Sequence, residues 1–242
     1  FTLLAILFVG AGRVLEVAWG DVFTNSSQAV VFLKGFLNPE WSYLPELIDP
    51  MIDTLLMSLA GTFIGVVLAI PAAFLGTYLV TRNYFVTVIF RAFFSLIRTI
   101  PNLLLAAIFV AIVGIGELTG VLTIAVFTFG MVSQLIFGSI ETIERGPIEA
   151  NESIGATRFQ LALTAVWPQV KDAIYGYALY AFEVNVRASA VLGYVGAGGI
   201  GVMLNSALSF FQFGRVSLII LMILLMIFIT NAISKYIRRE VL

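Results

Sequence analysis

The sequence predicts an all-α protein that crosses a membrane several times. Its composition is 60% hydrophobic and only 11% charged, with a mean hydropathy of +1.05, and these values lie outside the range of soluble domains. The chain also contains several uncharged apolar runs long enough to cross the hydrocarbon core of a bilayer, which takes roughly 20 helical residues. Lipid is therefore the expected solvent for most of the chain.

We expect six spans. They are, in order, Phe1 to about Gly12, Thr54 to Thr81, about Phe85 to Gly116, Leu118 to Ile140, a helix that starts after Asp172, and Val216 to about Ser234. The first run begins with Phe instead of Met and lacks the small-residue cleavage pattern of a signal peptide, so we interpret it as a truncated anchor helix. The predicted division is residues 1–53, with this truncated span and an outer interfacial segment, and residues 54–242, the core.

The outer segment, about Arg13 to Asp53, is predicted to contain an interfacial helix. Apolar side chains recur there at roughly helical spacing, and such a stretch tends to lie along lipid headgroups: Ala29, Val30, Phe32, Leu33, Phe36 and Leu37. Trp41 and Tyr43 suit the membrane interface. The segment is also acidic. A platform for a soluble partner and a solvated rim with interfacial anchors both fit this composition.

Several functions are excluded by what the sequence lacks. The net charge of −1 gives no support for nucleic-acid binding, and the absence of cysteine and histidine excludes thiol chemistry, Cys/His metal sites and Ser-His or Cys-His nucleophiles. We therefore expect no catalytic residue, metal site or cofactor on this chain. No P-loop motif occurs, so any work with ATP would have to be done by a partner. The G-A-G-G-I-G run at 196–201 matches a dinucleotide fingerprint only formally, since no strand is expected before it.

The polar stretch from Gly146 to Pro168 predicts a helix–glycine–helix knuckle between two spans. Pro147 suits a first helical position and Gly155 suits a position just past a helix end. Carboxylates follow in the first turns, where they interact favourably with the helix dipole: Glu149 and Glu152. A second helical run, Ala156 to Val166, is expected to last until the proline restarts the chain.

The distribution of Lys and Arg predicts the orientation. If the N-terminus lies inside, the inner loops and ends receive most of the basic residues: Arg82, Arg145, Arg158, Lys171, Lys235, Arg238 and Arg239. The outer side receives fewer: Lys34, Arg13 and Arg215. The knuckle, within a loop of residues 141–171, is therefore expected in the cytoplasm together with both termini.

Charged and polar residues inside spans are candidates for a translocation path, because an ionised group in the bilayer is costly and usually faces a bundle interior or a cavity. Glu183 and Arg187 are four residues apart, so they can pair on one helix face, and Asn185 points elsewhere. Both a structural ion pair and a place on the translocation path are open interpretations of Glu183 and Arg187. Arg98 lies just before Pro101, which is expected to kink its span. Arg91 can snorkel to the interface.

The glycine-rich run is the last tentative element of the path. Gly196, Gly198 and Gly199 suggest a broken helix, and irregular backbone at membrane depth requires cover from protein or a water-filled cavity. A bend that lines the path and simple helix packing through small residues are both compatible with this run.

Several of these motifs together resemble the membrane subunits of ABC importers, in the branch of phosphonate importers and their phosphite relatives. They are W-S-Y-L at 41–44, R-T-I-P at 98–101, G-P-I-E-A through S-I-G-A-T-R in the knuckle, and F-E-V-N-V-R followed by G-A-G-G-I-G. The similarity extends over nearly the whole chain. Phe127 and Gln134 depart from the histidine and the basic residue that family members often carry.

The resemblance implies a type I permease fold in a bacterial cytoplasmic (inner) membrane. It also implies a homodimer of this chain, two copies of an ABC ATPase below it, and an extracytoplasmic substrate-binding protein above it. The knuckle would be the coupling loop that docks on the ATPase, through Glu149, Ala150, Gly155 and Ala156, and ends at Pro168. The cargo would be a phosphonate or phosphite oxyanion.

Three alternatives remain open at this point. The loop and the glycine run would also fit a methionine-type importer. A secondary transporter could use Glu183 and Arg187 as a coupling pair, but it commonly shows two related halves with paired broken helices, and no repeat is visible. A membrane assembly subunit that transports nothing would not need charges inside its spans.

Overall fold

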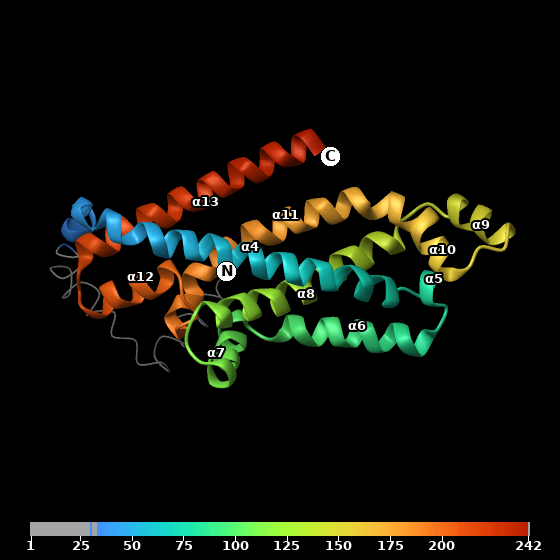
Figure 1. Cartoon of the computed structure of the whole chain (residues 1–242), viewed down its shortest axis with the longest axis horizontal. Helices are drawn as coiled ribbons and strands as arrows, with labels where there is room; N and C mark the ends of the chain where they lie inside the picture. Colours follow the sequence, from blue (N-terminus) through green and yellow to red (C-terminus); the bar gives the residue numbers. More distant parts are fainter. Residues whose placement is uncertain (1–29, 31–32, 242) are drawn as a thin grey trace, which may run out of the picture.

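The computed structural model describes residues 30 and 33–241, which form an elongated bundle of helices (Figure 1). The elements follow in the order η1 (Trp41–Tyr43), α4 (Leu44–Leu75), α5 (Tyr78–Thr81), α6 (Tyr84–Thr99), α7 (Asn102–Val113), α8 (Glu117–Glu141), α9 (Gly146–Ser153), α10 (Arg158–Leu161), η2 (Ala162–Val166), α11 (Trp167–Leu192), η3 (Gly193–Val195), α12 (Ile200–Ser209) and α13 (Phe213–Val241). No strand occurs among these residues, so the all-α prediction is confirmed.

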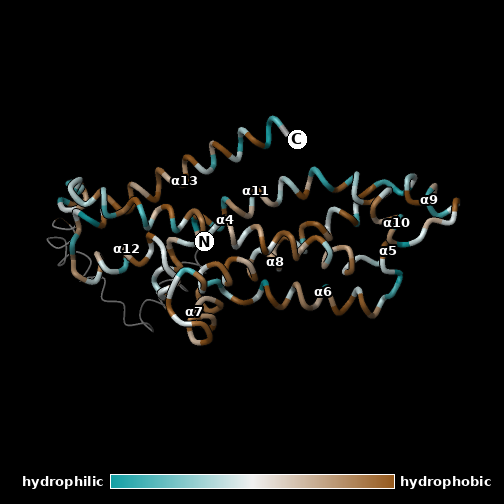
Figure 2. The backbone as a smooth tube through the Cα atoms, in the orientation of Figure 1, coloured by the Kyte–Doolittle hydropathy of each residue, from teal (hydrophilic) through white to brown (hydrophobic). Residues whose placement is uncertain are grey.

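Five segments match the predicted spans in length and composition. Three helices are long and apolar enough to cross a membrane unbroken: Trp41–Leu75, Glu117–Glu141 and Phe213–Glu240. Two bent pairs, α6 with α7 and α11 with α12, pass the same test together. The predicted first span, residues 1–12, lies outside the described residues. Figure 2 shows hydrophobic residues along these helices and hydrophilic ones around α9, α10 and the last turns of α13.

Close contact between α4 and α8 forms the centre of the bundle, and small residues allow it. A Cβ atom added to Gly65 would lie 2.6 Å from the Ala125 carbonyl oxygen, and one added to Gly61 would lie 2.6 Å from the Ile124 side chain. Lipid gives helices little hydrophobic reason to associate, so membrane interfaces depend on such close backbone approach. The core beside this contact is apolar and includes Val132 and Ile136.

The predicted start of the second span, Thr54, is wrong by ten residues, because α4 begins at Leu44 and ends at Leu75. The prediction depended on an uncharged run, but carboxylates such as Glu46 are favourable in the first turns of a helix and do not end it. Helix α4 therefore crosses the predicted division between residues 53 and 54. Thr77 to Arg82 form a separate turn with the short α5.

The outer segment is only partly described. Residues 33–36 are helical, as predicted, and residues 13–29, 31 and 32 lie outside the described part. Trp41 is exposed, as expected of an interfacial anchor, but Tyr43 is buried, with its ring 4.5 Å below the Arg215 guanidinium carbon. Arg215 also pairs with Glu40 at 3.2 Å. Tyr43 and Arg215 therefore fasten the start of α4 to the start of α13.

The kink predicted at Pro101 is confirmed, and the bend is large enough to divide the span into two helices. Helices α6 and α7 meet at 92°, with Ile100 and Pro101 in extended conformation between them. The residue before a proline avoids the helical region, and the proline has no N–H to donate. The predicted third span, 85–116, is thus two helices with Arg98 in the last turn of the first.

The break predicted at Pro168 does not occur. The chain is helical without interruption from Arg158 to Leu192, and the π-helical segment η2 precedes the proline, with the Trp167 N–H bonded to the Ala162 carbonyl. A π turn adds one residue to a helical turn and shifts the backbone carbonyls that the proline ring would otherwise meet, so the helix can continue through the proline. As a result, the knuckle is joined to the fifth span by one continuous helix.

Candidate functional site

The knuckle turns at Gly155, as the sequence predicted. The Ala156 N–H donates to the Asn151 carbonyl at 3.0 Å and the Gly155 N–H to the Glu152 carbonyl at 3.1 Å. This pair of bonds is the Schellman motif, which places the residue after the helix in the left-handed region, and Gly155 has φ +76°. At the other end of α9, Pro147 occupies the first turn, where its missing N–H costs nothing.

Side-chain hydrogen bonds hold the knuckle in one shape. The Thr164 hydroxyl donates to Asn151 Oδ1 at 2.8 Å, which ties α9 to η2. Thr157 and Gln160 form a capping box at the start of α10. The Glu144 N–H donates to Gln169 Oε1 at 3.0 Å, which ties the approach to α9 to the first turn of α11. The knuckle is therefore a stiff extension of α11.

The outer surface of the knuckle is exposed and has a large apolar tip. Glu149, Ala150 and Gly155 are exposed, and Ala156 is half-buried. Ile154 and Phe159 are 81% and 74% exposed. Apolar side chains this exposed beside a polar rim are typical of a protein contact. Sequence reasoning missed Ile154, although a large apolar residue directly before the turn glycine is a signal it could have used. Pro168 is exposed but lies on α11, away from this tip.

An arginine clamp connects the knuckle to the turn after α4. Glu152 pairs with Arg158 at 3.1 Å and with Arg82. Arg82 is held in the left-handed conformation, φ +50°, which is uncommon for a residue with a side chain. The hydrogen bond from Arg158 is the largest effect on the pKa of the Glu152 carboxyl, and desolvation, the next largest, opposes it. The positive charge and hydrogen bond of Arg82 add to the effect of Arg158, so the pKa lies below its ordinary value of 4.5.

We expect Glu152→Gln to lower the melting temperature of the purified protein at neutral pH and to have less effect in acid. A carboxyl whose pKa falls on folding contributes stability above its unfolded pKa and loses that contribution as the pH falls through the folded pKa. The difference between wild type and variant should therefore be largest above pH 4.5 and shrink below it. Thermal unfolding across pH measures this, and a difference that grows in acid contradicts the clamp.

The predicted pairing of Glu183 with Arg187 is wrong. The Glu183 carboxylate faces α13 and pairs with Arg238 at 3.6 Å, and the Arg187 Nε donates to the backbone carbonyl of Glu183 at 3.3 Å. The sequence could not reveal this, because Arg238 is distant in the chain and only the fold brings α13 beside α11. The ion pair joins the fifth and sixth spans. A place for Glu183 and Arg187 on a translocation path stays a prediction.

Asn185 points away from Glu183 and Arg187, as predicted, and is fully buried between three helices. Its Nδ2 donates to Thr62 Oγ1 on α4 and to Thr128 Oγ1 on α8, each at 2.7 Å. These two bonds join α11 to α4 and α8, and a place for Asn185 on a translocation path stays a prediction.

We expect Asn185→Leu to lower the free energy of unfolding by about 1–2 kcal/mol, because two interhelical hydrogen bonds are lost and hydroxyls stay buried without that partner. Adding Thr62→Val and Thr128→Val should restore most of the loss, since an all-apolar contact of similar shape leaves no polar group unpaired. Thermal unfolding of the single and triple variants in detergent measures both changes. A triple variant less stable than the single one contradicts this role.

The glycine run bends the chain by 47° and is covered by protein on both sides. Thr54 Oγ1 on α4 accepts the Ile200 N–H at 2.8 Å, and the Gly196 carbonyl accepts the Gly116 N–H at 2.9 Å. Gly196, Gly198 and Gly199 all have positive φ. The predicted bend is present, and these contacts favour the packing interpretation. A place for these glycines on a translocation path stays a prediction.

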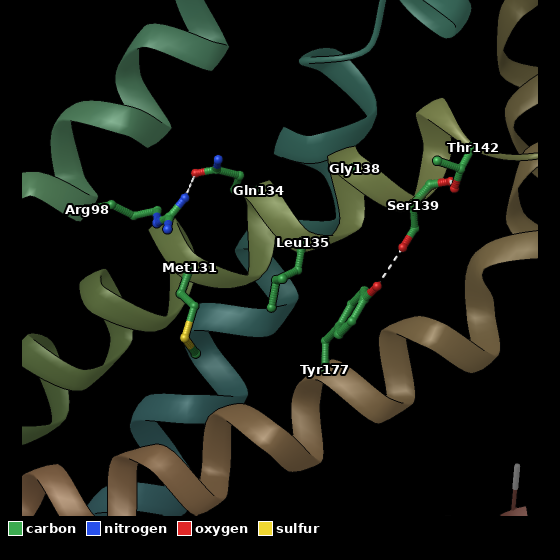
Figure 3. A pocket seen from close by; sticks show the side chains of 8 residues that line it. All are labelled: Arg98, Met131, Gln134, Leu135, Gly138, Ser139, Thr142 and Tyr177. Carbon is green, nitrogen blue, oxygen red and sulfur yellow. Dashed lines mark hydrogen bonds between the residues drawn. The ribbon is translucent and has the colours of Figure 1, made fainter.

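Arg98 faces a cavity of about 540 Å³ between α6, α8 and α11 (Figure 3). Its guanidinium donates to the Gln134 side-chain oxygen. Farther along α8, Ser139 Oγ and Tyr177 Oη are 2.6 Å apart. Arg91, predicted to snorkel to the interface, pairs with Glu141 at the end of α8 at 2.8 Å.

Membrane-length helices with a stiff, polar knuckle at one end are the arrangement expected of a membrane transport subunit. The chain matches, over residues 61–242, the family model described as the binding-protein-dependent transport system inner membrane component. It belongs to this family. It is therefore an inner-membrane transport permease of an ABC importer and not an enzyme.

Curated relatives extend this similarity to most of the chain. The phosphite transport system permease protein PtxC of Stutzerimonas stutzeri is 37% identical over 98% of this chain and 87% of its own length. The phosphate-import permease protein PhnE of Mycolicibacterium smegmatis is 33% identical over 80% of this chain and 36% of its own length. Among solved structures, the MetNI methionine ABC transporter aligns with a TM-score of 0.73 at 21% identity, over 83% of this chain and 98% of that one. This last likeness shows the type I permease fold alone.

Proposed function

We propose that this chain forms the translocation path of an ATP-driven importer for phosphite or phosphonate oxyanions. The observation that carries the proposal is the similarity to the phosphite permease along nearly the whole chain. A second putative phosphite permease, HtxC of Stutzerimonas stutzeri, is 30% identical over 87% of this chain. The site adds a cationic, hydroxyl-bearing cavity, which suits an anion.

The knuckle is the coupling element in this proposal. Glu149, Ala150 and Ile154 contact a groove on the ATPase, while Gly155 and Ala156 set the turn that presents them. ATP-driven closure of two ATPases pulls two knuckles together. Because α10, η2 and α11 form one continuous helix, movement of the knuckle tilts the fifth span, and Glu183–Arg238 passes that tilt to α13.

The partners follow from this mechanism. The knuckle lies in the cytoplasm with both termini, two copies of an ABC ATPase hold ATP and magnesium, and a substrate-binding protein docks on the opposite face. A second copy of this chain completes the path. The alternative is a different permease as the second half, because putative phosphite permeases HtxC and HtxE both occur in Stutzerimonas stutzeri. Co-purification of two differently tagged copies of this chain from one complex supports the homodimer, and recovery of one tag alone contradicts it.

Uptake by the reconstituted complex tests the proposed cargo. Proteoliposomes with this chain, its ATPase and its binding protein should accumulate phosphite or 2-aminoethylphosphonate only when ATP is supplied. Unlabelled phosphite and 2-aminoethylphosphonate should compete, while methionine should not. Competition by methionine alone would assign the chain to the methionine-type importers, and uptake without ATP or an ATPase would make it a secondary transporter.

A further inference from the structure

We propose that the cavity between Arg98 and the Ser139–Tyr177 pair is an oxyanion subsite of the translocation path, an inference that rests on the proposed function. The cavity lies between the last turn of α6, the second half of α8, and α11, and holds about 540 Å³. Since one water occupies about 30 Å³ of the liquid, this is room for a small oxyanion together with several of its waters.

The charge of the cavity is uncompensated. Arg98 is the one residue of its lining that is ionised at neutral pH, and the other lining residues are apolar or neutral: Met131, Gln134, Leu135, Gly138, Ser139, Thr142 and Tyr177. Five of the eight other arginines in the described part of the chain pair with carboxylates: Arg82, Arg91, Arg158, Arg215 and Arg238. Arg98 bonds to the neutral oxygen of Gln134 instead. No carboxylate of the cavity lining therefore balances the charge of Arg98, and its planar guanidinium has donors that match an oxyanion.

The far end of the cavity offers a hydroxyl donor. Ser139 Oγ and Tyr177 Oη share one hydrogen bond of 2.6 Å, in which either can donate. Two hydroxyls carry two protons, and one bond uses one of them, so one O–H of the pair stays free for an anion. In Figure 3 Arg98 and Gln134 lie at one end of the cavity, and Ser139, Thr142 and Tyr177 lie at the other.

Gly138 leaves the way between these two ends open. A Cβ atom added to it would meet nothing within 4 Å, and it lies within α8 without positive φ. A side chain at this position can therefore occupy the cavity without disturbing the helix. Since α8 leads toward the knuckle, an anion that leaves Arg98 for the hydroxyl pair moves along α8 toward the ATPase end.

Gln134→Glu is the decisive variant. A carboxylate at this position pairs with Arg98, so it strengthens a structural contact but cancels the charge that an anion needs. We expect ATP-dependent phosphite uptake by the reconstituted complex to fall at least about tenfold, while the melting temperature and the ATPase activity stimulated by the binding protein stay near wild type. We expect the maximal rate of uptake to fall and KM to stay unchanged, because the unaltered binding protein captures the substrate. Gly138→Leu should give the same result by filling the cavity.

The remaining variants and outcomes separate this subsite from the proposed function. Arg98→Lys should keep part of the uptake, Arg98→Gln should lose it, and Ser139→Ala with Tyr177→Phe should slow it. If the wild-type complex imports phosphite and Gln134→Glu and Gly138→Leu import it equally well, the subsite is wrong and the proposed function stands. If the wild-type complex imports no phosphorus oxyanion, both are wrong.

Discussion

Replacing Ile154 with glutamate is expected to reduce ATP-dependent uptake by about tenfold or more while the protein folds normally. The side chain is 81% exposed at the tip of the knuckle, so a charge there disturbs no contact of the folded chain. In the proposed coupling contact the same position enters a groove on the ATPase, and buried apolar anchors of an interface carry much of its energy. Uptake in proteoliposomes and co-purification with the ATPase measure the effect.

Ile154→Leu is the matched control, because it keeps the apolar volume and should transport at nearly the wild-type rate. If Ile154→Glu still binds the ATPase and imports normally, the tip of the knuckle is not the coupling contact.

Gly193→Ala is expected to prevent accumulation of the folded protein, or to lower its melting temperature by several degrees. The added methyl group would overlap the backbone of Gly201 at the start of α12. Backbone atoms cannot move aside by changing a side-chain rotamer, so the overlap is not easily relieved. Overpacking of this kind typically costs about 1–3 kcal/mol and sometimes more. Yield from membranes and thermal unfolding measure the change.

Gly138→Ala is the control for this experiment, because its methyl group meets open space and alanine is a better helix former than glycine by about 1 kcal/mol. Its melting temperature should equal or exceed that of the wild type. A Gly193→Ala protein as stable as Gly138→Ala would contradict the close packing of η3 on α12.

Local signals predicted much of this fold. Hydrophobic runs identified the three unbroken candidate spans and the two bent helix pairs. Pro101 predicted the bend after α6, and Pro147 with Gly155 predicted the knuckle. The bend and the knuckle depend on prolines and a glycine, whose own backbone preferences determine the structure of the residues beside them. The failures came where neighbours override a local rule: η2 accommodates Pro168, and the carboxylates early in α4 continue the helix.

Contacts between distant helices could not be read from spacing. Glu183 and Arg187 satisfy the four-residue rule, yet Arg238 on α13 takes the carboxylate. The bonds of Asn185 to Thr62 and Thr128, and the cavity that Arg98 and Tyr177 both line, likewise depend on which helix faces which. For the same reason, the sequence suggested Arg98 but not the hydroxyls opposite it.

Cysteine accessibility and crosslinking of Ala150→Cys test the central claim most directly, because these 242 residues contain no cysteine of their own. In intact cells a membrane-impermeant maleimide should label Trp41→Cys but not Ala150→Cys. In the assembled complex Ala150→Cys should crosslink to the ATPase subunit and to no binding protein. Labelling of Ala150→Cys from outside the cell, or its failure to crosslink to an ATPase that co-purifies, would contradict coupling through this knuckle.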